Sequence, residues 1–127
     1  MSVRLLPIVL ACALTAAGCG GDSGNGSPAA GTDLTVQMRD YEFDPRDVNL
    51  APGAVIHVTN EGQIAHNLKI ERGPDPTEET QELAGTDSFL PGDSENLEIA
   101  LPRGRYAMVC TVPGHRELGM TGRLRVR

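Results

Sequence analysis

Hydrophobic and polar residues alternate along much of the chain beyond residue 33. Leu34, Val36 and Met38 alternate with polar neighbours, and residues 96–101 repeat this pattern. In a pattern with a period of two residues, every second side chain lies on the same face, which is typical of a half-buried β-strand. The segment 54–60 (AVIHVTN) is rich in β-branched residues and predicts a central strand.

Turn residues separate these segments at short intervals. Tyr41 and Phe43 continue the alternation of the first strand, and residues 76–84 predict a helical turn or two. The chain contains 15 Gly and 9 Pro, which favours many turns over a helical bundle. Further strands are predicted at 47–50, 65–71, 105–110 and 122–127. The pattern as a whole predicts an all-β Greek-key sandwich or flattened barrel of about seven to eight strands.

The first 32 residues differ in composition from the rest. Arg4 precedes an uncharged, mostly apolar stretch at 5–17, which is too short to span a membrane and predicts a signal peptide over 1–18. The small residues before Cys19 resemble a bacterial lipoprotein cleavage box, which implies lipidation of Cys19; an ordinary secretory signal is the alternative. Residues 20–32 are rich in Gly, Ser, Pro and Ala, so 19–32 is predicted to be a flexible linker before a domain at 33–127.

The length and the net charge of the chain limit the classes of function that it can have. A chain of 127 residues is one domain's worth of material. Its formal net charge of −6 and its pI of about 4.9 provide no electrostatic footprint for nucleic acid. Nine acidic residues and one basic residue lie between Glu71 and Glu98, and this run predicts a solvated face.

The cysteines leave one thiol to explain. Cys12 lies in the predicted signal peptide and Cys19 is the predicted lipid site, so only Cys110 belongs to the domain. A single cysteine cannot form an internal disulfide. The Cys110 thiol is therefore an inert buried group, a dimerising thiol or a metal ligand.

The segment around Cys110 favours the metal ligand. Cys110, His115 and Met120 form a C-x4-H-x4-M pattern at the end of a predicted strand, and His66 supplies a second imidazole upstream. Thiolate, imidazole and thioether groups together suit copper in both of its oxidation states. The remaining histidine, His57, alternates with apolar neighbours on its strand and is predicted to face solvent.

With these residues the chain resembles the cupredoxins, the small blue-copper proteins that include plastocyanin, azurin and rusticyanin. The resemblance covers essentially the whole domain, and the Cys-Thr-Val-Pro-Gly-His loop is similar to those of azurin and rusticyanin. It implies that His66, Cys110 and His115 are equatorial copper ligands and that Met120 is the axial ligand. It also implies that Asn67 pins the ligand loop and supplies an amide hydrogen bond to the sulfur. The backbone N–H of Val112 is a candidate second donor to the sulfur.

Two functions fit this ligand set. The first is electron transfer, in which one copper ion cycles between Cu(I) and Cu(II) and a redox partner protein docks near His115. The second is a copper-binding lipoprotein for storage or delivery, although the chain has none of the Met-rich or His-rich tracts expected there. An enzyme is disfavoured because the chain has only three histidines. The predicted location is exported, either lipid-anchored at Cys19 to the outer face of the cell membrane or in the periplasm.

Overall fold

The computed structural model describes residues 33–127. The predicted signal peptide (1–18), the predicted lipid site Cys19 and the linker (19–32) lie outside the described residues. Within residues 33–127 no helix is long and apolar enough to cross a membrane.

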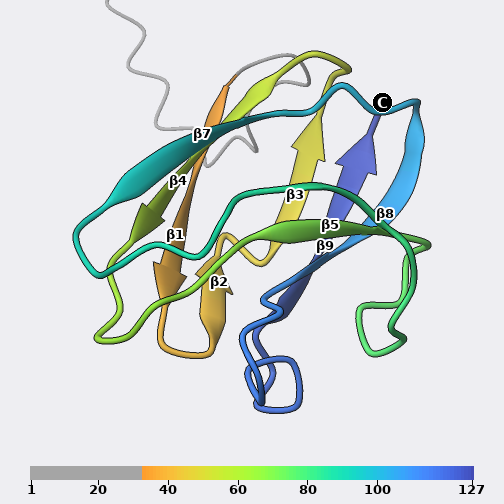
Figure 1. The fold of residues 1–127 in the computed structure, drawn as a ribbon. Helices are drawn as coiled ribbons and strands as arrows, with labels where there is room; N and C mark the ends of the chain where they lie inside the picture. The colour runs from red at the N-terminus through yellow and green to blue at the C-terminus, as the bar shows by residue number, and fades with distance from the viewer. Residues whose placement is uncertain (1–32) are drawn as a thin grey trace, which may run out of the picture.

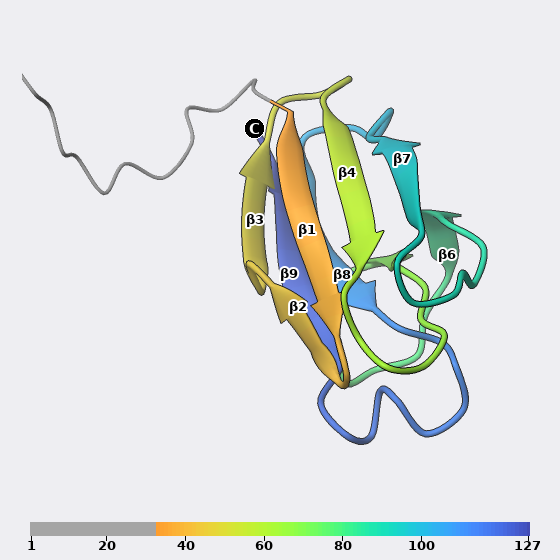
Figure 2. The ribbon, with the colours of Figure 1, turned by 90° about the vertical axis from the view of Figure 1, so that its left-hand side faces the viewer.

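Two β-sheets pack face to face and enclose one core (Figure 1 and Figure 2). One sheet has four strands in the order β2-β1-β4-β7, and the other has five in the order β3-β9-β8-β5-β6. The strands are β1 (Leu34–Arg39), β2 (Glu42–Asp44), β3 (Asp47–Leu50), β4 (Val55–Asn60), β5 (Lys69–Arg72), β6 (Glu82–Gly85), β7 (Ser94–Glu98), β8 (Gly104–Val109) and β9 (Thr121–Val126). The prediction of an all-β sandwich is confirmed, with more strands than the seven or eight expected.

Both sheets mix parallel and antiparallel pairs. β1 lies parallel to β4, with Val36 opposite Val58, and β3 lies parallel to β9, with Val48 opposite Leu124. The chain therefore crosses between the sheets instead of forming simple hairpins throughout. This topology brings the β1–β2 turn, the β4–β5 loop and the β8–β9 loop to one end of the sandwich, the lower end in Figure 1.

The core follows the alternation seen in the sequence. Val36, Met38, Ile56 and Met108 are fully buried between the sheets. His57, which alternates with the buried residues of β4, is exposed and its Nδ1 lies 2.6 Å from Oδ1 of Asn96 on β7. The predicted solvent-facing position of His57 is confirmed.

The first predicted strand is shorter than expected because the chain reverses at Asp40 and Tyr41. Tyr41 has a positive φ of 66°, and the following residues return as β2. Phe43 therefore lies on β2, opposite Met38, rather than on a continuation of β1. Alternation alone did not reveal the turn because the polar and apolar positions keep the same period through it.

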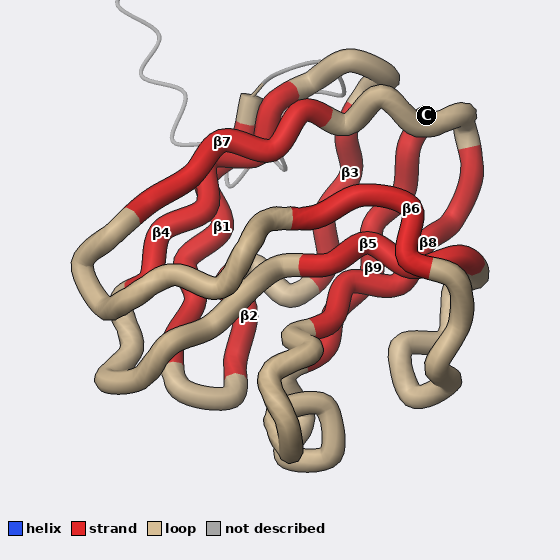
Figure 3. The backbone as a smooth tube through the Cα atoms, in the orientation of Figure 1, coloured by secondary structure: helices blue, strands red, loops and turns tan. Residues whose placement is uncertain are grey.

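The predicted helical turns at 76–84 are wrong. Residues 73–81 form an irregular loop, and Glu82–Gly85 is strand β6, as Figure 3 shows. Two prolines remove backbone donors from the loop, and the side chain of Asp75 accepts hydrogen bonds from the N–H and hydroxyl groups of Thr77. β6 instead pairs with the free edge of β5, where its backbone groups find partners. The predicted strand at 65–71 also begins later, at Lys69, because His66 forms only an isolated bridge with Phe89.

Candidate metal centre

Three metal-ligating side chains meet at the end of the sandwich where the loops gather. Nδ1 of His66 lies 3.1 Å from Nδ1 of His115, and Sγ of Cys110 lies 3.4 Å from Nδ1 of His115 and 4.0 Å from Nδ1 of His66. All three residues are buried. The structure thus brings together residues 66, 110 and 115, which the sequence singled out.

His66 is held by the backbone of a neighbouring loop. Its N–H donates to the carbonyl of Phe89 at 3.3 Å, and its own carbonyl accepts from the N–H of Phe89 at 3.0 Å. This two-bond bridge fixes the backbone that carries the imidazole, at a position far from Cys110 in the sequence.

The loop from Cys110 to Met120 is closed by its own backbone. The N–H of His115 donates to the carbonyl of Val112 at 3.0 Å, and the N–H of Met120 donates to the carbonyl of His115 at 3.0 Å. At the base of the loop the N–H of Cys110 donates to the carbonyl of Met120 at 3.1 Å. Gly114 has a φ of 84°, the left-handed conformation that this turn requires. Met120 is fully buried at the base of the same loop.

Asn67 ties the ligand loop to the segment that carries His66. Its Oδ1 accepts the backbone N–H of Thr111 at 2.8 Å, and its Nδ2 donates to the Thr111 hydroxyl at 3.0 Å and to the Ser88 hydroxyl at 3.2 Å. The side chain of a residue adjacent to His66 therefore fixes the residue adjacent to Cys110.

Opposing effects act on the Cys110 thiol. Burial raises its pKa, whereas hydrogen bonds from the backbone N–H groups of Asn67 and Val112 lower it. Hydrogen bonds to sulfur stabilise the charged form, and burial penalises that form unless a cation lies beside it. The site thus suits a thiolate that is neutralised by a metal ion.

His115 is almost enclosed. Only 6% of its surface is exposed, and the ring of Tyr41 lies edge-on to it with ring centroids 5.2 Å apart. Burial lowers the pKa of His115, and repulsion from His66 lowers it further, while Asp40 partly opposes this. A neutral imidazole is the form that binds a metal.

Sequence reasoning missed two residues of the β1–β2 turn. Asp40 places Oδ1 2.9 Å from Nε2 of His66, and Tyr41 lies against His115. Hydrogen bonding to His66, together with that to the backbone of Gln63, lowers the pKa of Asp40. An aspartate next to a reversal of the chain is common in turns, so no pattern distinguished it as part of the site.

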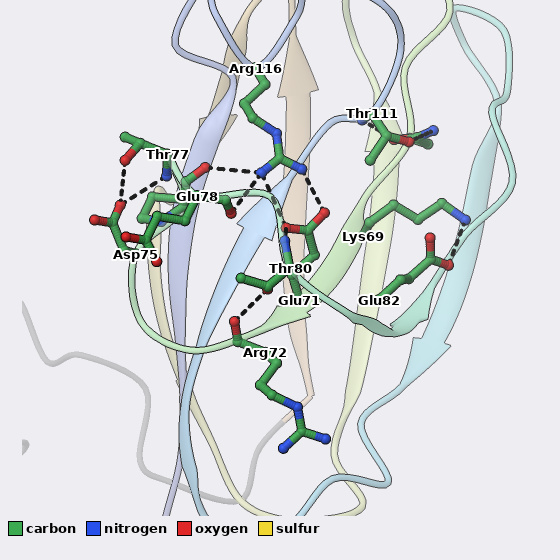
Figure 4. A network of polar contacts seen from close by, with 12 residues as sticks. Lys69, Glu71, Arg72, Asp75, Thr77, Glu78, Thr80, Glu82, Thr111 and Arg116 are labelled. Atoms are coloured by element: carbon green, nitrogen blue, oxygen red, sulfur yellow. Dashed lines mark hydrogen bonds and ion pairs between the residues drawn. The ribbon is translucent and has the colours of Figure 1, made fainter.

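Sequence reasoning also missed an ion pair behind the ligand loop, between a half-buried arginine and a buried glutamate (Figure 4). Arg116 Nη2 lies 2.6 Å from Oε1 of Glu71, and Nη1 lies 3.1 Å from Oε2. Nη1 also donates to the carbonyl of Glu78 at 3.0 Å. Glu71 is only 3% exposed, so it departs from the solvated face predicted for the acidic run. Arg116 follows His115 directly, and this pair therefore braces the ligand loop against β5 and the 73–81 loop.

The donor set fits copper. One sulfur and two imidazole nitrogens converge with their donor atoms all within 4.8 Å of one another, and soft and borderline ligands of this kind suit Cu(I) and Cu(II). Both imidazoles present Nδ1, which leaves their Nε2 atoms free for outer partners. The three donor atoms are thus already close enough to bind one metal ion without a change of the backbone.

Comparisons with known proteins agree with this geometry. The family model described as copper-binding proteins of the plastocyanin/azurin family matches residues 30–127. Comparison with curated protein sequences gave no match.

Solved structures share the fold. Reduced auracyanin from the photosynthetic bacterium Roseiflexus castenholzii is 22% identical with a TM-score of 0.67, covering 77% of this chain and 98% of its own. Auracyanin B is 24% identical with a TM-score of 0.63, covering 82% of this chain and 93% of its own. A copper-containing nitrite reductase from Thermus scotoductus is 18% identical with a TM-score of 0.56, covering 75% of this chain and 22% of its own.

At these identities the solved structures show a common fold, while the family model covers more than two thirds of the sequence, including all four residues of the candidate site. The chain belongs to the plastocyanin/azurin family of copper-binding proteins.

Proposed function

We propose that this protein is an exported blue-copper electron carrier whose single copper ion is bound by His66, Cys110, His115 and Met120. The observation that carries the proposal is the buried convergence of Sγ of Cys110 with the two Nδ1 atoms. His66 and the ligand loop are each held by backbone hydrogen bonds, so the protein fixes the positions of the donors. A site that changes little between Cu(I) and Cu(II) favours rapid electron exchange.

Hydrogen bonds to the sulfur support the same function. The N–H groups of Asn67 and Val112 favour the negative sulfur, and the side chain of Asn67 stabilises the loop that carries it. We assign these two residues as outer partners of the thiolate. Outer partners of this kind orient metal ligands and tune the metal.

Electron transfer is favoured over storage and over catalysis. A buried thiolate and imidazole in a closed loop, together with the imidazole of His66, hold copper firmly, which is a disadvantage for a protein that must release it. The match to a nitrite reductase spans only 22% of that enzyme's chain, so the shared fold by itself implies no catalysis. Only three histidines occur in this sequence and His57 points to solvent on β4, which leaves two for a metal site.

The proposal also includes a surface for a partner and a cellular location. Tyr41 and Leu118 are exposed by 40% and 61%, and Tyr41 contacts His115. We propose that a redox partner protein docks on this end of the sandwich, where His115 lies next to the exposed ring of Tyr41. The N-terminal sequence supports export, with lipidation of Cys19 as the anchor to the outer face of the membrane.

Copper titration followed by visible absorption tests the proposal. One equivalent of Cu(II) should produce an intense thiolate-to-copper band. Cys110→Ser should abolish this band, while the matched control His57→Ala, which removes an exposed imidazole on β4, should retain it. A colourless copper complex of the wild-type protein would refute the blue site.

A further inference from the structure

The carboxylate of Asp40 lies against the outer edge of a proposed copper ligand. Oδ1 of Asp40 is 2.9 Å from Nε2 of His66, while Nδ1 of the same ring faces Cys110 and His115. The His66 side chain is fully buried, and 33% of the Asp40 side chain is exposed. The ring of His66 therefore connects the metal centre to a carboxylate that borders solvent.

The adjacent loop is built around this contact. The backbone N–H of Gln63 donates to the same Oδ1 at 2.9 Å. A Cβ atom at Gly62 would collide with Oδ1 of Asp40 and would lie 2.9 Å from Nε2 of His66. The absence of a side chain at residue 62 thus leaves the space in which the carboxylate and the imidazole meet.

We propose that Asp40 is a positioning residue for His66 and that its negative charge lowers the reduction potential of the copper. This inference rests on the proposed function. A carboxylate acceptor holds the proton of His66 on Nε2, so that the lone pair on Nδ1 points to the metal. Without Asp40, Nε2 would lose its side-chain acceptor in a fully buried ring.

The sign of the effect follows from the charges. Cu(II) carries one more positive charge than Cu(I), so a nearby carboxylate stabilises the oxidised state more. Outer partners of metal ligands change metal affinity by about 10–100-fold. Because water reaches part of Asp40, we take the lower figure and expect about a tenfold change in the preference for Cu(II) over Cu(I), or about 59 mV for one electron.

Asp40→Asn separates the charge from the contact, since asparagine keeps an oxygen acceptor of similar shape. Voltammetry should show a potential about 59 mV higher than that of the wild-type protein, with the blue band retained. Glu42→Gln is the matched control. It removes the same charge two residues away, at the exposed first position of β2, where Glu42 makes no side-chain hydrogen bond or ion pair within residues 33–127. A shift in Asp40→Asn no larger than that in Glu42→Gln, or a lower potential, would overturn the proposed tuning.

The positioning role is measured separately in the metal-free protein by NMR of the histidine rings. His66 should carry its proton on Nε2, with slow exchange against solvent, in the wild-type protein and in Asp40→Asn. Asp40→Ala should accelerate that exchange. A His66 ring protonated on Nδ1 alone would overturn the positioning role. A wild-type protein that forms no blue complex would refute the proposed function, while the ring measurement would still decide whether Asp40 positions His66.

Discussion

Replacing Arg116 should destabilise the metal-free protein because it strands a buried carboxylate. Arg116 supplies both charged hydrogen bonds to Glu71, whose side chain is 4% exposed. In Arg116→Met, the only hydrogen bond that the Glu71 carboxylate keeps within residues 33–127 comes from the backbone N–H of Thr80, at 3.3 Å. Breaking one side of a buried ion pair costs about 3–5 kcal/mol. We expect about 3 kcal/mol, at the lower end, because the Arg116 side chain is 15% exposed and water reaches part of the pair.

The double variant Glu71→Met with Arg116→Met tests whether the cost comes from the stranded charge. Replacing both members of a buried pair with apolar residues of similar volume is often neutral or stabilising. We therefore expect the double variant to recover most of the stability lost in Arg116→Met. Urea unfolding of the metal-free proteins, followed by circular dichroism, gives the free energies of unfolding.

Two results would contradict this reasoning. A loss below about 1 kcal/mol in Arg116→Met would mean that the ion pair behaves like an exposed one. A double variant less stable than Arg116→Met would mean that the aliphatic and backbone contacts of Arg116 dominate, including its bond to the carbonyl of Glu78. Arg72→Met is the matched control, because Arg72 is exposed and, among the described residues 33–127, its side chain bonds only to Gln81.

Substitutions at three further positions test other parts of the protein. Met120→Leu should keep the blue colour and raise the potential, and Met120→Gln should lower it, because a weak axial donor stabilises Cu(II); unchanged potentials in both would show that Met120 only packs. Cys19→Ala should release the protein from membranes, and mass spectrometry of the native N-terminus should find an acylated Cys19; an unmodified N-terminus that begins elsewhere would reduce the prediction to simple secretion. Gly122→Ala should cost about 1–3 kcal/mol in urea unfolding, since its Cβ would collide with the carbonyl oxygen of Arg46, and an unchanged midpoint would contradict this contact.

The strands that the sequence predicted well are those with one face in the core. In β1 and β4 the buried residues alternate with polar ones, so burial and sequence period coincide. Residues 82–85 gave no such signal. Their strand exists because the edge of β5 offers backbone partners across the 73–81 loop, and pairing through the backbone leaves no pattern in the side chains.

The metal ligands and their supports differ in the same way. Cys110, His115 and Met120 share one loop, so their spacing was visible in the sequence, and His66 was recognised from its chemistry and its neighbour Asn67. Asp40 and Glu71 are ordinary acidic residues in sequence, and only the fold shows that one meets His66 and the other meets Arg116.

Asp40 and Glu71 lie in different electrostatic surroundings, so their replacement should affect different properties of the protein. Asp40 is part-exposed and contacts the ring of a proposed ligand, so its charge acts on the copper through one imidazole. Glu71 is buried and fully engaged by Arg116, so the opposite charge beside it cancels most of its field at the metal. Removing the charge of Asp40 should therefore change the potential with little effect on stability. Removing the partner of Glu71 should instead change stability first, because it leaves a buried carboxylate without its opposite charge.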